Sequence, residues 1–262
     1  MISSLYMKDS YLNRNVELLT NENIIEYDLK SANTSLCREY EIIPIKEIER
    51  LEKMDKKKRV VTFGKMMRTD KSLADKLKEA FIDIRKRFFE ANDIQDGDVL
   101  AIKKDAIFCL KEMHFTEFGH CRFVKKNAYT SFMRVGNLEL YYAATFSETN
   151  PDGQLDVKGI ADEALDKHDP YMMSFLRTLF KHLELSEKGV QAKYLTRFVT
   201  RYKHCKLDLG YYREFNHASV FRVLDSETTY DEKVFLPEHP FESLDISYNF
   251  STVILPIVRI LL

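Results

Sequence analysis

The sequence predicts an α+β fold in which helical segments flank a central antiparallel sheet. Its 262 residues include only 8 Gly and 6 Pro, while 31% are charged, a composition typical of long helices and few irregular loops. Apolar residues recur at helical spacing between residues 72 and 89 and again after residue 160, and short β-prone runs separate these two stretches. A chain of this length can bury a sizeable core without disulfides or a structural metal.

Charge, cysteine and hydropathy patterns exclude several classes of protein. The 40 Lys and Arg balance 41 Asp and Glu, which argues against a uniformly basic nucleic-acid coat and leaves local patches to be considered. The four cysteines lack CxxC spacing and predict reduced core thiols. No secretory signal or presequence follows Met1, and the apolar stretch 250–262 is shorter than the roughly 20 residues that span a bilayer. We therefore expect a cytoplasmic protein without a membrane segment, and a C-terminus that forms a buried strand or docking tail.

The first elements place a carboxylate near the end of a strand. The run Ile24–Leu29 predicts a short strand, and helix-capping residues open the segment Asn33–Tyr40. A second helix is expected after Pro44. Asp28 therefore lies near the end of the strand, where it could serve only to cap the helix that follows.

A basic helical hairpin is expected next. Between Lys53 and Arg87 there are thirteen Lys or Arg and five Asp or Glu, the strongest local basic bias in the chain. Six apolar residues from Ser72 to Phe89 keep helical spacing and leave the basic residues largely on other faces: Leu73, Leu77, Ala80, Phe81, Ile84 and Phe88.

The middle of the chain predicts an antiparallel sheet. Two β-prone runs between Asp98 and Leu110 predict a hairpin with Asp105 at its tip. Further strands are expected at Cys121–Val124, Leu138–Ala144 and Leu155–Ile160. From residue 161 to about 206 the pattern is helical, with a stripe of basic residues at Lys193, Arg197 and Arg201. The last fifty residues predict short strands and loops.

Asp28 and Asp105 form a candidate metal site if the strand and the hairpin pair in one sheet. Mg²⁺ prefers one or two carboxylates together with substrate phosphates. Flanking lysines would neutralise a triphosphate, and a basic helix stripe would hold a polynucleotide backbone whatever its sequence. Asp105 could equally be only a turn residue, which is what hairpin tips usually contain.

Three short motifs follow one another along the chain: YDLKSANTSL at Tyr27–Leu36, KKKRVVTFG with Lys56, Phe63 and Gly64, and IKKDAIF at Ile102–Phe108. In this order they resemble the first palm motif, the fingers motif and the third motif of template-dependent DNA polymerases, above all family B. Their family patterns are Asp-x-x-Ser-Leu-Tyr-Pro-Ser, Lys-x-x-x-Asn-Ser-x-Tyr-Gly and Asp-Thr-Asp-Ser-Ile-Phe.

Two further segments extend this resemblance. KKNAY at Lys125–Tyr129 is similar to the Lys-Lys-Arg-Tyr segment that touches the primer end, and LDVKGI at Leu155–Ile160 is similar to the strand that precedes the thumb. Asp105 matches the second aspartate of the third motif, which the family uses as a metal ligand. The matches cover roughly residues 24 to 160 in the family's order.

The resemblance implies a right-hand polymerase-like fold. Its parts would be residues 1–52 as the first part of an antiparallel palm, 53–95 as short helical fingers, 96–160 as the second part of the palm, and 161–262 as a helical thumb with a C-terminal tail. Asp28 and Asp105 would bind two Mg²⁺ ions, for which Mn²⁺ could substitute. The implied nucleotide contacts are Ser31, Asn33, Lys56, Arg59 and Lys65. The implied nucleic-acid contacts are Lys125, Lys126, Tyr129, Lys158, Lys193, Arg197 and Arg201.

The chain also departs from the family pattern. Lys103 takes the place of the first aspartate of the third motif, and Asn33 takes the place of the tyrosine that excludes a ribose 2′-hydroxyl. Val60 and Val61 replace the Asn-Ser of the fingers motif. Only about 27 residues precede the first motif, so we expect no proofreading exonuclease domain. A compact polymerase of this kind suggests a phage or mobile-element origin.

The expected function is template-directed DNA synthesis on a primer–template from nucleoside triphosphates, with accessory replication proteins as further partners. Two alternatives remain open: a catalytically silent palm-like protein that binds nucleic acid or a replication partner, and a template-independent or primase-like nucleotidyltransferase. The sequence has no P-loop, GxGxxG or GxSxG motif, which argues against Walker-type NTPases, dinucleotide-binding enzymes and α/β-hydrolases.

Overall fold

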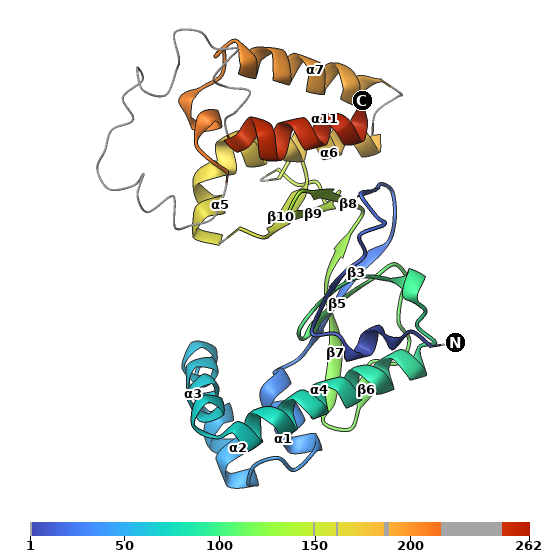
Figure 1. Cartoon of the computed structure of the whole chain (residues 1–262), viewed down its shortest axis with the longest axis vertical. Helices are drawn as coiled ribbons and strands as arrows, with labels where there is room; N and C mark the ends of the chain where they lie inside the picture. Colours follow the sequence, from blue (N-terminus) through green and yellow to red (C-terminus); the bar gives the residue numbers. More distant parts are fainter. Residues whose placement is uncertain (1, 149, 161, 186–188, 216–247) are drawn as a thin grey trace, which may run out of the picture. The chain divides into compact units, whose positions relative to one another are not determined.

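The computed structural model describes residues 2–148, 150–160, 162–185, 189–215 and 248–262. Its contacts divide the chain into two compact units (Figure 1). Unit 1 comprises Met1–Arg14 and Asn23–Ala128, and unit 2 comprises Asn15–Glu22 and Tyr129–Leu262. The division after Ala128 falls inside the segment 96–160, which the sequence analysis assigned to one part of a palm.

Unit 1 contains a six-stranded sheet in the order β1-β4-β5-β3-β7-β6. The pairs β1–β4, β4–β5, β5–β3 and β7–β6 are antiparallel. The strands are β1 (Ser10–Leu12), β3 (Ile24–Leu29), β4 (Val99–Lys103), β5 (Ala106–Cys109), β6 (Glu117–Phe118) and β7 (Cys121–Tyr129). The expected strand at residues 24–29 and the expected hairpin within residues 98–110 are both confirmed.

Helices form the rest of unit 1. They are the 3₁₀-helices η1 (Ser4–Met7) and η2 (Asp96–Asp98), with the α-helices α1 (Ala32–Glu39), α2 (Ile45–Glu52), α3 (Lys56–Thr69) and α4 (Lys71–Ala91). The predicted basic hairpin is present as α3 and α4. Asp55 caps α3 by accepting the amide of Lys58 at 2.9 Å, and Asp70 caps α4 by accepting the amide of Leu73 at 3.1 Å.

The long helix α4 packs its apolar face against the sheet. All six residues whose spacing predicted this face are buried. The ring of Phe88 lies 5.7 Å from that of Tyr27 on β3 and 4.2 Å from that of Phe123 on β7. Because strand side chains alternate, Tyr27 faces this core while its neighbours Glu26 and Asp28 point to the other face of the sheet.

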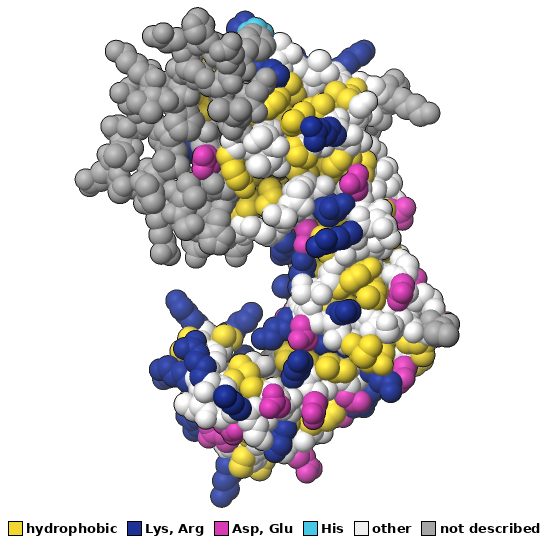
Figure 2. All heavy atoms as spheres, viewed as in Figure 1, with side chains coloured by type: hydrophobic (Ala, Val, Ile, Leu, Met, Phe, Trp, Pro, Cys, Tyr) yellow, Lys and Arg dark blue, Asp and Glu magenta, His cyan; other side chains and the backbone are white. Residues whose placement is uncertain are grey.

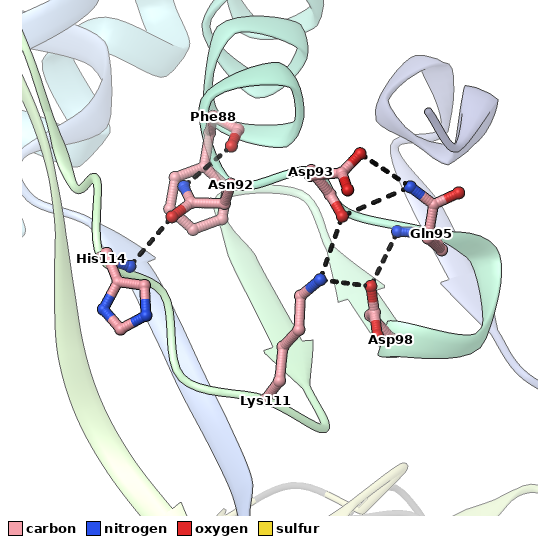
Figure 3. Close-up of polar contacts among 7 residues, drawn as sticks. All are labelled: Phe88, Asn92, Asp93, Gln95, Asp98, Lys111 and His114. Atoms are coloured by element: carbon pink, nitrogen blue, oxygen red, sulfur yellow. Dashed lines mark hydrogen bonds and ion pairs between the residues drawn. The ribbon is translucent and has the colours of Figure 1, made fainter. Parts of the chain in front are cut away.

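A polar cluster joins the end of α4 to the loop that follows β5 (Figure 3). The side-chain amide of Asn92 donates to the carbonyls of Phe88 at 2.9 Å and Phe115 at 2.7 Å. Its oxygen accepts the amides of His114 and Phe115, each at 2.9 Å. One side chain therefore hydrogen bonds to four backbone groups, of which, among the described residues, only the Phe88 carbonyl also accepts a backbone amide, that of Asn92 at 3.3 Å.

A lysine from the same loop completes the cluster (Figure 3). Lys111 Nζ lies 2.6 Å from the Asp98 carboxylate and donates to the Asp93 carbonyl at 3.0 Å. The Asp98 carboxylate also accepts the amide of Gln95 at 2.8 Å. These contacts fix the short connection from α4 into β4, the strand that leads to Asp105.

Unit 2 has a four-stranded sheet in the order β10-β9-β8-β2 and a group of helices. The strands are β2 (Leu18–Leu19), β8 (Ser131–Val135), β9 (Leu138–Ala143) and β10 (Gln154–Lys158). The helical elements are α5 (Asp162–His168), the π-helix η3 (Asp169–Met173), α6 (Ser174–Leu185), α7 (Val190–Lys203), the 3₁₀-helix η4 (Leu209–Tyr212), the π-helix η5 (Phe250–Ile254) and α11 (Leu255–Leu261). Strands β8 to β10 and these helices share one apolar core.

The α+β class is confirmed, and two details of the expectation are wrong. The described strands form two separate sheets rather than one, because β2 pairs with β8 and the strands after β7 continue that second sheet. The C-terminal segment is helical rather than a strand. Pro256 lies in the first turn of α11, directly after the π-helix η5, and Val253, Ile254 and Ile257 are buried. Most of the short strands and loops expected for the last fifty residues lie outside the described residues.

The cysteine and membrane expectations can be compared with the described residues. All four thiols are free, and Cys37, Cys109 and Cys121 are buried, as expected for reduced core cysteines. Burial raises the pKa of Cys37 to about 11 and keeps its thiol protonated. Among the described helices, none has both the length and the apolar character that crossing a bilayer requires.

The Asn92 cluster predicts a measurable loss of stability. Asn92→Ala removes the side chain that pairs the amides of His114 and Phe115 and the carbonyl of Phe115, so we expect the free energy of unfolding to fall by about 2 to 3 kcal/mol. Gln95→Ala is the matched control in the same cluster and should cost less than about 1 kcal/mol. Urea denaturation measures both. Equal stability of Asn92→Ala and wild type would show that this side chain does not hold the loop.

A buried histidine makes unit 2 sensitive to acid. Burial lowers the pKa of His168 to about 4, whereas an unfolded chain binds the proton near pH 6.5. The contribution of the neutral imidazole to the free energy of unfolding is fully present above pH 6.5. It is lost as the pH falls from 6.5 towards 4, by about 2 kcal/mol at pH 5. His168→Phe should flatten this pH dependence in denaturation experiments, and His204→Phe, at an exposed site, should not. An unchanged slope in His168→Phe would contradict the assignment.

Candidate active site

Strand pairing brings the two predicted carboxylates together in unit 1. Asp28 on β3 lies opposite Ala106, the first residue of β5, and Asp105 immediately precedes it in the turn between β4 and β5. The amide of Leu29 donates to the carbonyl of Asp105 at 3.0 Å, which ties the turn to β3. The alternative in which Asp28 caps α1 is wrong, because the N-cap of that helix is Ser31.

Both aspartates line a pocket of about 520 Å³. Five of its lining residues are cationic, and they come from four different elements or turns: Lys30, Lys56, Arg59, Lys104 and Lys126. Two carboxylates surrounded by five cations suit a ligand that carries several negative charges and is accompanied by a metal ion. Phe63 and Phe81 add apolar surface to the same pocket.

The electrostatics of Asp28 reflect this crowding. Burial, followed by the negative charge of Asp105, raises the pKa of the Asp28 carboxyl above its ordinary value. Lys126 and Lys56 act in the opposite direction and favour the ionised form. Ionisation of Asp28 therefore lowers the free energy of unfolding at neutral pH. Carboxylates at functional sites commonly have this property.

Glu26 does not line the pocket but adjoins it through Lys126, and the sequence did not identify it. It is only 2% exposed and lies two residues before Asp28, so both side chains point to the same face of β3. Its carboxylate lies 3.2 Å from Lys126 Nζ and accepts the side-chain amide of Asn127 at 2.6 Å. The period of two in a strand was the signal that could have identified it.

Of two neighbouring lysines on β7, only one lines the pocket. Lys126 faces Glu26 and the pocket, whereas Lys125 points to the opposite side of the strand and lies 3.4 Å from Glu112. The resemblance implied the same role for both. The strand's alternation instead separates them and makes Lys125 a natural control for Lys126.

The predicted nucleotide contacts are largely collected in this pocket. Ser31 and Asn33 line it from the start of α1, and Lys56 and Arg59 line it from α3. Lys65 is exposed further along α3, beyond the lining residues. Lys and Arg side chains gather over this helix in the space-filling view (Figure 2).

The remaining predicted contacts belong to unit 2. Tyr129 is buried, and its hydroxyl donates to Asp156, whose carboxylate also lies 4.0 Å from Lys158 Nζ. Lys193, Arg197 and Arg201 are exposed along α7, opposite the buried side of that helix. The Arg201 guanidinium donates to the carbonyl of Lys206 at 3.1 Å.

The residues that the structure describes contain no group of three or more His, Cys, Asp or Glu side chains placed to hold one ion. Asp28 and Asp105 offer carboxylate oxygens, and Mg²⁺ commonly binds one or two carboxylates and takes its remaining ligands from water and phosphate. The pair therefore fits a metal that arrives with a phosphorylated ligand better than a permanently held structural ion.

Replacement of Lys126 should change the titration of Asp28. Lys126→Met removes a positive charge that favours the carboxylate, so the pKa of Asp28 should rise further. Lys125→Met, on the opposite face of β7, should leave it unchanged. A carboxyl-carbon NMR titration of each variant measures the pKa directly. An identical Asp28 titration in the two variants would show that Lys126 does not act on this carboxylate.

Comparison with known proteins identifies one family. The whole chain, residues 1–262, matches the family model described as "Bacteriophage PBS1 gene 130 protein". No curated protein matches the chain. The bacteriophage family agrees with the phage origin that the sequence analysis expected. The description of this family names no activity.

Proposed function

The chain belongs to the bacteriophage PBS1 gene 130 protein family, and we propose that it is a nucleotidyltransferase that extends a nucleic-acid primer. One observation carries the proposal. The antiparallel pairing of β3 with β5 places Asp28 beside Asp105 in a pocket lined by lysine and arginine. Carboxylates for divalent metals and cations for a triphosphate are the main protein groups that phosphoryl transfer requires.

In the proposed reaction the primer 3′-hydroxyl attacks the α-phosphate of a bound nucleoside triphosphate. A new oxygen–phosphorus bond forms, the bond between the α-phosphate and the pyrophosphate oxygen breaks, and the hydroxyl proton leaves to solvent. Two Mg²⁺ ions on Asp28 and Asp105, for which Mn²⁺ could substitute, would supply the charge stabilisation on both oxygens. Asp28 serves this role only when ionised, and the lysines beside it favour that form.

The cations of the pocket have a clear part in this scheme. Lys56 and Arg59 lie one turn apart on α3, so both can face the same polyphosphate. Lys30 and Lys104, which the sequence analysis did not select, add positive charge from the turns after β3 and β4. We assign these four residues to the phosphates and Asn33, in the same pocket, to the nucleoside.

For nucleic-acid binding we propose the exposed stripe of α7 in unit 2. Lys193, Arg197 and Arg201 are spaced by four residues and share one face of the helix, where they can contact backbone phosphates without regard to sequence. Tyr129 is left out of this surface, because it is buried and hydrogen bonded to Asp156.

Two observations favour a catalytically silent alternative. Lys103 takes the place of a carboxylate in the third motif, and the nearby Glu26 is paired with Lys126. A protein with this pocket could bind primer–template or a replication partner without transferring a nucleotide. It would show salt-dependent affinity for nucleic acid but no metal-dependent incorporation.

Primer extension tests the proposal directly. A labelled primer on a defined template is incubated with Mg²⁺ or Mn²⁺ and with deoxy- or ribonucleotides in separate reactions. Asp28→Asn and Asp105→Asn should each lower incorporation by roughly a hundredfold or more, because the metal contribution is several kcal/mol. Neither variant should lower the thermal midpoint, since each removes one of two repelling charges.

The matched control is Asp75→Asn, which changes an exposed carboxylate on α4 and should retain full activity. Full incorporation by either pocket variant would overturn the metal assignment. Extension that ignores template sequence would indicate a template-independent enzyme. Binding of primer–template with no incorporation would support the silent alternative.

A further inference from the structure

The apolar face that α4 packs against the sheet contains one charged residue. Arg85 is 1% exposed and lies among Phe81, Ile84 and Phe88 on that helix. Burial of a guanidinium is costly unless its donors are satisfied, and its Nε has no hydrogen-bond partner among the described residues. An apolar side chain would avoid this cost, which argues for a role other than stability alone.

The two terminal nitrogens of Arg85 join two distant segments of the chain. Nη2 lies 2.8 Å from the Asp9 carboxylate, and Nη1 donates to the backbone carbonyl of Lys104 at 3.2 Å. The amide of Lys104 in turn donates to the backbone carbonyl of Asp9 at 2.8 Å. Arg85, Asp9 and Lys104 thus form a closed set of three hydrogen bonds.

This set holds a turn of unfavourable backbone conformation. Lys104 has a φ of 57°, in the left-handed region that a residue with a side chain adopts at a cost. The next residue is Asp105, and its carbonyl accepts the amide of Leu29 at 3.0 Å. The direction of the Asp105 side chain therefore depends on the conformation that the Arg85 contacts stabilise.

We propose that Arg85 is a positioning residue that holds the Lys104–Asp105 turn so that Asp105 faces Asp28 and shares a metal with it. This inference rests on the proposed function. Arg85 does not line the pocket and acts through Asp105 alone. Loss of Arg85 should therefore weaken metal binding only in a protein that still has the Asp105 carboxylate.

Mn²⁺ binding to the full chain, followed by electron paramagnetic resonance, tests this dependence. Arg85→Met should raise the Mn²⁺ dissociation constant about ten- to hundredfold, the usual effect of removing a group that orients a metal ligand. In an Asp105→Asn background the same substitution should have no further effect. Arg85→Lys, which keeps a donor for the carbonyl of Lys104 or for Asp9, should restore part of the affinity.

Arg87→Met is the matched control on the same helix. Arg87 also forms an ion pair, with Glu39 at 2.9 Å, but does not contact the turn. It should lower stability without changing Mn²⁺ affinity. If Arg85→Met does not fold, Asp9→Asn provides the test, because it weakens the same contact from a side chain that is 58% exposed. Equal Mn²⁺ affinity in wild type and the Arg85 or Asp9 variant, or an additive loss in the double variant, would overturn the proposal.

Amide hydrogen exchange separates this inference from the proposed function. The amides of Leu29 and Lys104 should exchange faster in Arg85→Met than in wild type, whereas Arg87→Met should leave them unchanged. Absence of Mn²⁺ binding in the wild type would refute the metal assignment but leave this readout intact. Unchanged exchange at both amides in Arg85→Met would refute the positioning role whatever the metal result.

Discussion

The pocket of unit 1 depends on one backbone constraint, the antiparallel register that sets Asp28 opposite Ala106. Because side chains alternate along a strand, this register sends Tyr27 into the core beneath α4 and Asp28 to the opposite face. A shift of one residue would bury Asp28 against Phe88 and expose Tyr27, at a large cost in free energy. The apolar core therefore selects the position of the acidic pair, and no separate interaction is needed to bring Asp28 to the turn that carries Asp105.

The second determinant is the balance of charge around that pair. Burial, and after it the negative charge of Asp105, raises the pKa of the Asp28 carboxyl. The lysines that line the pocket compensate for part of this cost, while Lys126 is itself held by the buried Glu26. The result is a site with excess positive charge around a small acidic centre. This charge distribution supports the proposal of a polyanionic ligand that is accompanied by a divalent cation.

Much of this arrangement could be predicted from the sequence, since it follows from local periodicity. The strand 24–29, the hairpin around Asp105 and the buried face of α4 were all identified by spacing, and pairing of the two strand elements implied the acidic pair. Arg85 and Lys104 were not identified, because their roles depend on contacts between segments far apart in the chain. Strand β8 was missed because its sequence, SFMRV, does not alternate between apolar and polar residues. The prediction of a C-terminal strand was wrong. Val and Ile favour strands locally, but in this segment they pack into the core of unit 2 from a helix.

The two helices that meet at Asp70 are anchored in the core of unit 1 to different extents. Asp70 ends one helix and caps the next, so no flexible linker separates them. Helix α4 is anchored by eight buried residues, but α3 buries only Phe63. The side of the pocket that carries Lys56 and Arg59 therefore contributes little to the core. The opposite, acidic side is formed by Asp28 on β3, a central strand of the sheet, and by Asp105 in the turn between β4 and β5. Helix α3 contributes Phe63 and the partly buried Met66 and Met67 to this core, so its separation from unit 1 would expose less apolar surface than separation of α4, and we expect the cationic wall of the pocket to open before the carboxylate wall does.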